Sequence, residues 1–366
     1  MKISVISSYS YIRHYNNYGA LFQYYALQKY LEKRGHYVEW IRTESSSISK
    51  RGILRLFYSY FRHPFMLVHD IKVNLCHIKF MLFVKNHLYT TKKDYKNILE
   101  LTNTPPTADF YITGSDQVWS GCSPKNYLTF VHDSNKKIAY AASFGEDYIA
   151  KEKEDVIKPW LQAFEAISVR EDTGVEICKS MGIKAVHLVD PTLLISSEDY
   201  LTTEQSKFKK QHYFGYFLNI NNRSDIWYDD LQRYVHAENA ELKVTAIQGA
   251  EKCIDKDILI YPSPKEWVGY IRSSEGIFTN SFHGTLFAIL FHKPFIVFLQ
   301  TGNSAKQNGR IRSLLKMFAL SDRLYDGTTT IDAVIKRPIN WEEIEIIKPG
   351  VTGDFFKEDD VKDLAV

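Results

Sequence analysis

The sequence lacks the short motifs that mark several large classes of enzyme. It contains no GxGxxG after its first predicted strand and no GxxxxGK[ST], so neither a dinucleotide site nor a P-loop is supported. The HExxH zinc motif is absent, as are Asp and Glu clusters with metal-ligand spacing. The GxSxG turn of the α/β-hydrolases is also missing. We therefore expect no metal and no resident cofactor.

Cysteine and long apolar runs are also scarce. The four cysteines lie far apart without a CxxC pair, which favours free thiols in a reducing compartment. No run of about 18 apolar residues occurs, and the opening MKISVISSYS lacks the apolar core of a signal peptide. A net charge of +3 is too small to indicate nucleic-acid binding. We expect a cytoplasmic protein that does not bind nucleic acid.

What the chain does contain is an alternation of predicted strands and helices over 366 residues, enough for two domains, each with its own core. Alternation of this kind predicts parallel sheets and an α/β fold of two doubly wound domains. The predicted helices are 19–35, 152–164, 175–181, 263–273 and 284–291. The predicted strands are 2–7, 37–41, 110–112, 138–142, 166–169, 185–189, 213–218, 242–247, 276–279 and 294–299. The polar segment 171–192 contains the domain boundary, and we assign 1–175 to the first domain and 176–340 to the second.

One segment interrupts this alternation. Residues 48–98 form a basic insert, in which 50–96 hold ten Lys or Arg against two Asp, interleaved with aromatic and aliphatic residues. The pattern fits a helical hairpin that packs its apolar face on the N-terminal domain. It equally fits a surface that docks on anionic lipid headgroups or a lipid-linked acceptor, because both need the same amphipathic pattern.

Polar or glycine-rich loops follow several predicted strands, at the end of an α/β sheet where ligands bind. The loop 7–19 leads into a helix, where Asn17 is either an N-cap or part of a ligand site with Tyr18. After strand 110–112, Asp116, Gln117 and Trp119 form a set suited to sugar hydroxyls and a pyranose face. Asp116 equally fits a capping role.

Two further loops carry charge or a titratable group. Arg170 follows strand 166–169 and offers a planar fork for a carboxylate or phosphate, or forms a salt bridge with Glu171 or Asp172. In FTNSFHGTLFAIL (278–290), a predicted strand passes directly into a predicted helix. The residues between them that we assign to an anion site are Asn280, Ser281, His283, Gly284 and Thr285. His283 can give or take a proton there.

These loops together resemble the polysaccharide pyruvyl transferase family. The resemblance runs in order from about residue 10 to about residue 320. It rests on NYGALFQYYAL (17–27), TGSDQVW (113–119), YAASFG (140–145), SVRED (168–172), VDPTLL (189–194), TNSFHGT (279–285) and NGRIRSLL (308–315). It implies a GT-B-like fold of two Rossmann-like domains facing a cleft, with segment 341–366 returning to the N-terminal domain.

The resemblance also implies a reaction and roles for residues. The family transfers pyruvate from phosphoenolpyruvate to a sugar of a cell-surface polysaccharide or lipid-linked precursor, forming a ketal. Arg170 then corresponds to an arginine that holds the donor anion, and His283 to the donor-site histidine. Members often carry Arg where this chain has Ser281, and Arg310 or Arg13 is the candidate replacement.

We therefore predict a transferase with phosphoenolpyruvate as donor substrate and no cofactor. His283 and Asp116 are the predicted catalytic residues. Predicted donor-binding residues are Arg170, Asn280, Ser281, Gly284, Thr285 and Arg310, and acceptor-binding residues are Asn17, Tyr18, Gln117 and Trp119. A glycosyltransferase using a nucleotide sugar and a non-catalytic glycan-binding protein are the alternatives. A lipid-linked acceptor would bring the chain to the inner face of the membrane.

Overall fold

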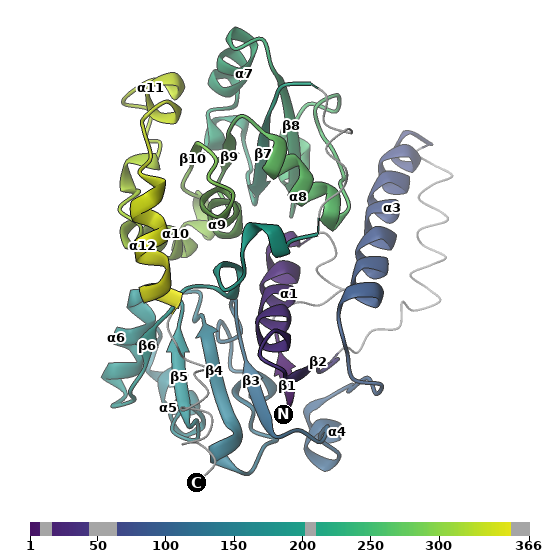
Figure 1. The fold of residues 1–366 in the computed structure, drawn as a ribbon, viewed down its shortest axis with the longest axis vertical. Helices are drawn as coiled ribbons and strands as arrows, with labels where there is room; N and C mark the ends of the chain where they lie inside the picture. The colour runs from purple at the N-terminus through teal and green to yellow at the C-terminus, as the bar shows by residue number, and fades with distance from the viewer. Residues whose placement is uncertain (8–16, 44–63, 202–209, 353–366) are drawn as a thin grey trace.

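The computed structural model describes residues 1–7, 17–43, 64–201 and 210–352, which fold into two parallel sheets joined by helices (Figure 1). The first sheet has the order β2-β1-β3-β4-β5-β6, and the second has the order β10-β9-β7-β8. In the described residues, each of the ten predicted strands is present, so the predicted α/β fold is confirmed. The strands are β1 (Lys2–Ile6), β2 (Tyr37–Trp40), β3 (Phe110–Thr113), β4 (Lys137–Ala142), β5 (Ala166–Val169), β6 (Val186–His187), β7 (His212–Leu218), β8 (Glu241–Ile247), β9 (Ile277–Thr279) and β10 (Phe295–Val297).

Helices connect the strands, and all five predicted helices are present. Local signals mark their starts: Asn17 caps α1 by accepting a hydrogen bond from the Ala20 amide, and Ser263 and Glu266 form a capping box on α8. The helices in the described ranges are α1 (Tyr18–Glu32), α3 (Pro64–His87), α4 (Ile98–Asn103), α5 (Lys151–Leu161), α6 (Asp172–Ser180), α7 (Tyr228–Ala237), α8 (Pro264–Ser273), α9 (Phe282–Leu290), α10 (Asn308–Met317), α11 (Ile331–Ile335) and α12 (Trp341–Thr352).

Each sheet reverses its strand order at one place. In the first sheet, β2 lies on one side of β1 and β3 lies on the other side, so the strand order reverses between β2 and β3. In the second sheet β7 and β8 lie on one side of the reversal and β9 on the other. Ligands of open α/β sheets bind beyond the carboxyl ends of the strands at such reversals. A ligand site is therefore expected at the loops after β1, β3, β7 and β9.

The division between the sheets falls later than the predicted domain boundary. β6 (Val186–His187) pairs in parallel with β5 and completes the first sheet, although the predicted second domain begins at residue 176. The second sheet begins with β7 at His212. The segment between them includes a 3₁₀ turn at Pro191–Leu193 that packs on α1.

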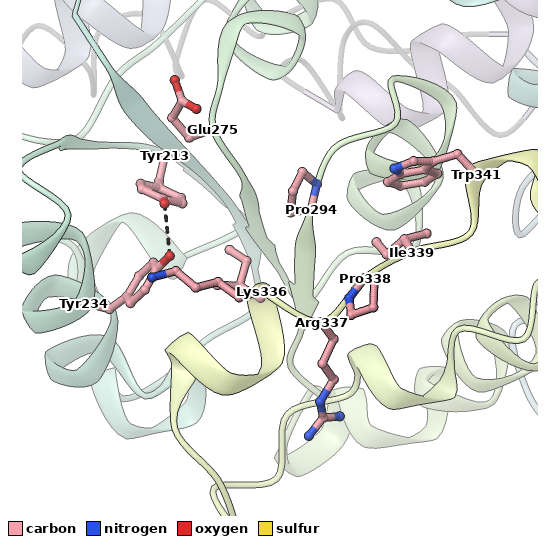
Figure 2. A pocket seen from close by; sticks show the side chains of 10 residues that line it. Tyr213, Tyr234, Glu275, Pro294, Lys336, Arg337, Pro338, Ile339 and Trp341 are labelled. Atoms are coloured by element: carbon pink, nitrogen blue, oxygen red, sulfur yellow. Dashed lines mark hydrogen bonds between the residues drawn. The ribbon is translucent and has the colours of Figure 1, made fainter.

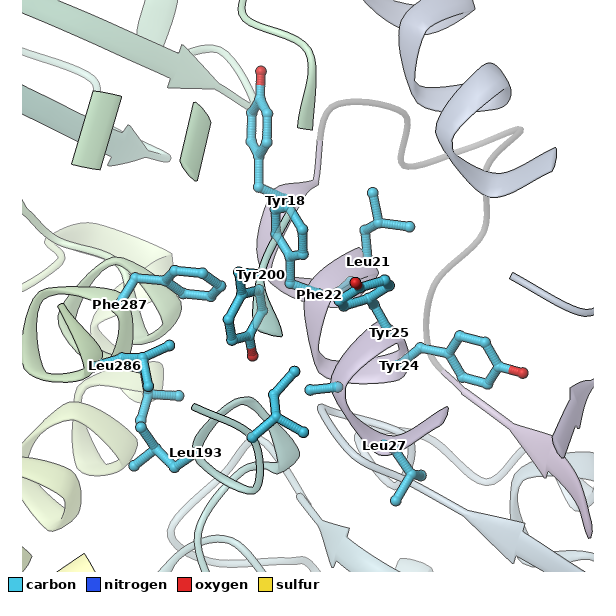
Figure 3. Close-up of a cluster of buried hydrophobic side chains, with 14 of the residues drawn as sticks. Tyr18, Leu21, Phe22, Tyr24, Tyr25, Leu27, Leu193, Tyr200, Leu286 and Phe287 are labelled. Carbon is cyan, nitrogen blue, oxygen red and sulfur yellow. The ribbon is translucent and has the colours of Figure 1, made fainter. Parts of the chain in front are cut away.

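One hydrophobic core cluster is shared by both halves, in addition to clusters that lie wholly within the first half or wholly within the second. It contains Val5 of β1 and Phe214 of β7, and it is centred on aromatic residues from α1, α8 and α9. Figure 3 shows Phe22 of α1 beside Phe287 of α9 and Tyr200. Their ring centroids lie 5.4 Å and 5.7 Å from that of Phe22, respectively. The two halves are therefore joined by packed rings.

Two predicted segments lie partly outside the described residues. Of the basic insert, residues 48–63 are not described, and the described remainder contains α3, which lies beside α1 in Figure 1. Of the predicted C-terminal return, α12 is described and residues 353–366 are not. α12 packs near the 3₁₀ turn at Pro191–Leu193, and Ile344 on it belongs to the shared core.

Candidate active site

The loops after β3, β5 and β9 bring charged side chains together between the two sheets. Asp116 follows β3, Arg170 follows β5, and His283 lies at the start of α9 just after β9. At the second reversal point, the Asn280 amide donates to the Leu218 carbonyl at 2.7 Å and accepts from the Leu218 amide at 2.9 Å. Asn280 thereby ties the carboxyl ends of β7 and β9 together and sets where α9 begins. Its polar atoms bind the backbone, so it supports the site.

Arg170 is the centre of this cluster. Its Nη1 donates to Asp190 Oδ2 at 2.9 Å, its Nε to Glu171 Oε1 at 3.1 Å, and its Nη2 to Asp116 Oδ1 at 3.3 Å. The side chain is fully buried, and its guanidinium lies 4.3 Å from the ring centroid of Phe282. The salt-bridge alternative for Arg170 is therefore present, and all three guanidinium nitrogens bind carboxylates of the chain itself.

Charges in this cluster shift one another's pKa values. Burial acts to raise the pKa of Asp116, but the positive charges of Arg170, His283 and Arg310 outweigh burial, and the net result is a lowered pKa. For Asp190, burial is again outweighed by His283 and Arg170, which hold its pKa well below the ordinary value. For Arg170, burial acts to lower the pKa, but the three carboxylates raise it. These groups stay ionised around neutral pH.

His283 lies at the start of α9 with one ring nitrogen toward Asp190. Its Nε2 is 3.4 Å from Asp190 Oδ2, within ion-pair distance but not aligned as a hydrogen bond. That nitrogen is buried and has no hydrogen-bond partner. Buried polar atoms without a hydrogen-bond partner are uncommon, and the group nearest to this nitrogen that could pair with it is the Asp190 carboxylate. Ser281 caps the helix beneath it by accepting from the Gly284 amide at 3.3 Å.

The start of α1 lies against the other side of the His283 ring. A Cβ atom added to Gly19 would lie 2.2 Å from His283 Nδ1, which is far inside contact distance. Gly19 is therefore needed for close approach of a helix backbone to this ring. Two helix N-termini, those of α1 and α9, thus meet at His283, and helix N-termini favour anions.

Arg310, on α10, completes the cluster from the C-terminal half. Its Nη1 lies 4.0 Å from Asp116 Oδ1, and its Nη2 donates to Gln307 Oε1 at 2.7 Å. With its amide oxygen turned toward Arg310, Gln117 accepts from both Nη atoms at 3.2 Å. Burial, with the nearby charge of Arg170, lowers the pKa of Arg310 to about 10, so it remains positively charged near neutral pH. The predicted residues Gln117 and Arg310 therefore lie together.

Two predicted acceptor residues are core residues, and those predictions are wrong. Trp119 has no exposed surface, donates through Nε1 to the Asn126 carbonyl at 3.1 Å, and stacks on Tyr127. Tyr18 is also buried, donates to the Pro262 carbonyl at 2.7 Å, and stacks on Trp267. An apolar ring with a satisfied polar atom is typical of an aromatic core residue. Neither ring can stack on a sugar in this arrangement.

The remaining predicted residues shape the backbone around the cluster. Asn17 is the N-cap of α1, which was the structural alternative. The Thr285 hydroxyl donates to the Ser281 carbonyl at 3.0 Å. Gly284 is needed because a Cβ there would lie 2.2 Å from Thr279 Oγ1. Arg13 lies outside the described residues.

Asp190 was not predicted as a site residue. Its Oδ2 accepts from Ser115 Oγ at 3.0 Å as well as from Arg170, and its Oδ1 accepts from the Thr192 amide at 3.0 Å. The signal was the Asp-Pro in VDPTLL, because an Asp before Pro marks a turn near the end of a strand. The sequence could not show that this turn folds back onto the loops after β3 and β5.

Other parts of the structure offer no comparable cluster. Within the described ranges, no group of three or more His, Cys, Asp or Glu is placed to hold a metal ion. A pocket of about 290 Å³ lies beside Tyr213, Glu275 and Pro294 (Figure 2). These residues stand at the amino ends of β7, β9 and β10, the end of the sheet opposite to the one where ligands of such folds bind.

We use the name charged network for Asp116, Arg170, Glu171, Asp190, His283 and Arg310.

Solved structures with the same fold define the class. The chain is similar to S. aureus MnaA in a co-structure with UDP, with a TM-score of 0.54 and 12% identity, covering 98% of this chain and 94% of that one. It is also similar to Arabidopsis thaliana UGT89C1 complexed with UDP, with a TM-score of 0.52 and 11% identity, covering 100% and 99%. These and related neighbours are GT-B epimerases and glycosyltransferases, so the predicted GT-B-like fold is confirmed.

The particular family follows from the sequence. The model of the polysaccharide pyruvyl transferase family matches residues 17–300, and the chain belongs to that family. The matched range includes five of the six members of the charged network and ends before Arg310. No curated protein matches this chain by sequence. Among the described residues, no helix combines the length and hydropathy needed to cross a bilayer.

Proposed function

We propose that this chain transfers pyruvate from phosphoenolpyruvate to two hydroxyls of one sugar, giving a cyclic ketal. Membership of a transferase family of this kind supports the proposal. The observation that carries it is the His283 ring, whose Nε2 lies 3.4 Å from Asp190 Oδ2, at a point where two helix N-termini meet. The reaction needs both an anion site and a proton donor, and this position offers both.

The reaction can be written as four changes at the donor. A proton adds to C3 of phosphoenolpyruvate, and positive charge develops at C2. A sugar hydroxyl attacks C2 and releases its proton. The bond between C2 and the bridging oxygen of the phosphate group breaks, and phosphate leaves. A second hydroxyl of the same sugar then attacks C2 and releases its proton, which closes the ring. Of the two released protons, one replaces the proton given to C3 and the other leaves with phosphate.

We assign the proton transfer to C3 to Nδ1 of His283, with Nε2 facing Asp190. In a histidine–carboxylate pair, the carboxylate orients the ring and stabilises its protonated form while the other nitrogen does the chemistry. The lowered pKa of Asp190 keeps it ionised in that role. Positioned acid–base groups contribute roughly 10²–10⁴-fold to rate. Asp190 is then a positioning residue.

We assign donor binding to Arg310 and the amides at the start of α9. Arg310 keeps its charge and retains a slightly exposed side chain, whereas Arg170 is fully buried among three carboxylates. In this proposal Arg170 holds Asp116 and Asp190 in place and contacts the donor less than the resemblance implies. Asp116, with its lowered pKa, is a weak proton acceptor and serves to bind acceptor hydroxyls.

The acceptor in this proposal is a sugar of a cell-surface polysaccharide or of its lipid-linked precursor, and the reaction takes place at the cytoplasmic face of the membrane. The donor carries the reactive group, so the scheme needs no resident cofactor. Family membership supports this acceptor class.

The experiment is incubation of the purified protein with phosphoenolpyruvate and a panel of glycosides and lipid-linked sugars. We expect a product heavier by pyruvate less one water, with release of inorganic phosphate, and neither with His283→Gln. Transfer from a UDP- or GDP-sugar, with protection against heat by the nucleotide but not by phosphoenolpyruvate, would instead identify a glycosyltransferase. Glycan binding without any product from either donor would identify a non-catalytic protein.

A further inference from the structure

Helix α3 (Pro64–His87) has two apolar faces, and the residues that the structure describes cover only one of them. The inner face presents Cys76, Phe80, Phe83 and Val84, which are all buried. The outer face presents Ile71, Leu75, Ile78 and Leu82, which are 47%, 53%, 51% and 51% exposed. Successive spacings of four, three and four residues place these four side chains on one stripe, opposite the inner face. We call it the outer stripe.

The inner face fixes α3 to the molecule. Phe80 packs edge-on against Tyr18 at 4.8 Å between ring centroids, and Phe83 packs against Phe22 at 5.7 Å. The Cys76 thiol donates to the Pro262 carbonyl at 3.2 Å. Because these contacts come from both α1 and the segment before α8, the helix is anchored to both halves, and its opposite side cannot turn inward.

The charges along the outer stripe are mostly positive, with Asp70, directly before Ile71, as the acidic residue of α3. Residues 71–93 contain no Asp or Glu and include Lys72, Lys79, Lys85, Lys92 and Lys93. Lys79 is paired with Glu266 of α8 at 3.0 Å. Lys72 and Lys85 are exposed on the same helix as the stripe. Exposed aliphatic side chains flanked by lysines are the composition of helices that lie in a bilayer interface.

We propose that the outer stripe docks on an anionic phospholipid surface, with α3 lying in the plane of the interface and the lysines meeting the headgroups. A surface of this kind supplies both an apolar layer and negative charge. A second copy of the chain would instead bring lysines toward lysines across a two-fold axis. Residues 44–63 hold four Lys or Arg against one Glu, so they offer the stripe no complementary charge either.

This docking would place the charged network near the lipid surface. α1 lies beside α3 in Figure 1. Tyr18 of α1 packs on Phe80 of α3, and the next residue, Gly19, lies against the His283 ring. The inference rests on exposure and charge, and it holds whether or not the proposed reaction is right. Vesicle binding requires no turnover, so the two proposals fail separately.

The experiment is flotation of the full chain with vesicles of phosphatidylcholine alone or mixed with phosphatidylglycerol. We expect binding to the mixed vesicles that weakens as salt rises. The combined variant Leu75→Gln, Ile78→Gln and Leu82→Gln should lower partitioning by roughly tenfold or more, because it removes apolar area from the interface. The matched control is Leu99→Gln with Ile346→Gln, at sites 69% and 77% exposed but away from α3. Circular dichroism checks that each variant folds.

A charge variant and a labelling experiment distinguish a lipid surface from the other possible occupants of the outer stripe. Lys72→Gln with Lys85→Gln should reduce the preference for phosphatidylglycerol while leaving residual apolar binding. Leu75→Cys in a Cys122→Ser background should react rapidly with a maleimide in the absence of vesicles and slowly in their presence. Equal binding by the stripe variant and its control overturns the proposal. Slow labelling of the cysteine without vesicles also overturns the proposal. A dimer mass would then show that a second copy covers the outer stripe, and a monomer mass would show that another part of the same chain covers it.

Discussion

At the scale of single residues, Asp190 connects the parts of the charged network. One oxygen of its carboxylate faces Arg170 and Ser115 from the first sheet, and His283 from the second half. Because it lies between the two sheets in the chain, its turn can reach loops from both. The usual cost of burying a carboxylate is offset by these partners, which lower its pKa. A residue in this position aligns the histidine that the sequence singled out.

His283→Gln should remove turnover while leaving the donor bound. Glutamine retains a hydrogen-bonding side chain of similar reach but does not exchange a proton near neutral pH. We expect kcat to fall by roughly 10²-fold or more, with a smaller change in donor Kd. Steady-state phosphate release and calorimetric titration with phosphoenolpyruvate measure the two quantities. The exposed His132→Gln is the control, and near-parent turnover in a folded His283→Gln protein would make the histidine structural.

Gly19→Ala tests whether the space beside the His283 ring matters. The added methyl would overlap Nδ1, so the ring must move, while alanine itself suits a helix. We expect at least a tenfold loss in kcat, since a displacement of this size at a reacting group costs up to about 10²-fold. Gly121→Ala is the matched control, because a Cβ there meets nothing within 4 Å. If Gly19→Ala retains full activity, Nδ1 is not the atom that transfers the proton.

At the scale of elements, the sequence was sufficient to predict where the strands and helices lie. It was not sufficient to predict which side chains face the core. The short β-branched and aromatic runs predicted the strands because buried parallel strands need continuous apolar residues, as in β7. Trp119 and Tyr18 were misassigned because an aromatic residue in a polar loop has the same sequence signal whether it stacks on a ligand or fills a core. Only the fold shows that Asn126 and Pro262 already accept their hydrogen bonds.

The candidate site was predicted in part for the same reason. The residues following β3, β5 and β9 were identified because carboxyl ends of parallel strands share one edge of a sheet. The partners of Arg170 were not, because the pairing of one guanidinium with three carboxylates depends on loops from residues 116, 171 and 190 meeting in space. The spacing of these residues along the chain does not show that their loops come together in space.

Trp119→Ala should therefore damage stability and leave acceptor binding largely unaffected. The indole stacks on Tyr127, contacts Phe144 and is fully buried, so its removal leaves a cavity. We expect a loss of about 3–5 kcal/mol in the free energy of unfolding, measured by urea titration. Trp119→Phe should lose less, because it keeps most of the ring and forfeits mainly the hydrogen bond to Asn126. A stable Trp119→Ala protein with a raised acceptor KM would restore the sugar-stacking interpretation.

At the scale of the whole molecule, the two halves are joined by charges as well as by packed rings. Asp116 and Asp190 have lowered pKa values in the folded protein. A carboxyl with a lowered folded pKa adds stability above its unfolded pKa of about 4, and that stability is lost as pH falls toward the folded value. The network should therefore loosen in acid and remain intact at neutral pH.

Asp190→Asn isolates this contribution. The variant should be less stable than the parent at neutral pH, since it leaves Arg170 and Ser115 with a weaker partner. The difference in melting temperature between the two proteins should be constant above about pH 5 and shrink as pH falls from about 4 toward 2, because the unfolded parent then binds a proton at this carboxyl while the folded parent still keeps it ionised. Thermal unfolding followed by circular dichroism measures both. A difference that stays constant with pH would show that the carboxylate does not stabilise the fold through its charge.

The shared core makes a prediction about how the molecule unfolds. If the halves had only their separate cores and no shared one, two independent transitions would be expected, as for linked domains. Here Phe22 of α1 packs between Trp267, Phe287 and Tyr200, so unfolding either half exposes rings of the other. We expect a single calorimetric transition whose van't Hoff enthalpy equals the calorimetric enthalpy. Phe22→Ala should weaken this coupling and separate the halves into two transitions. Two transitions in the parent protein would contradict this expectation. They would mean that the halves unfold independently although the rings between the sheets are in contact.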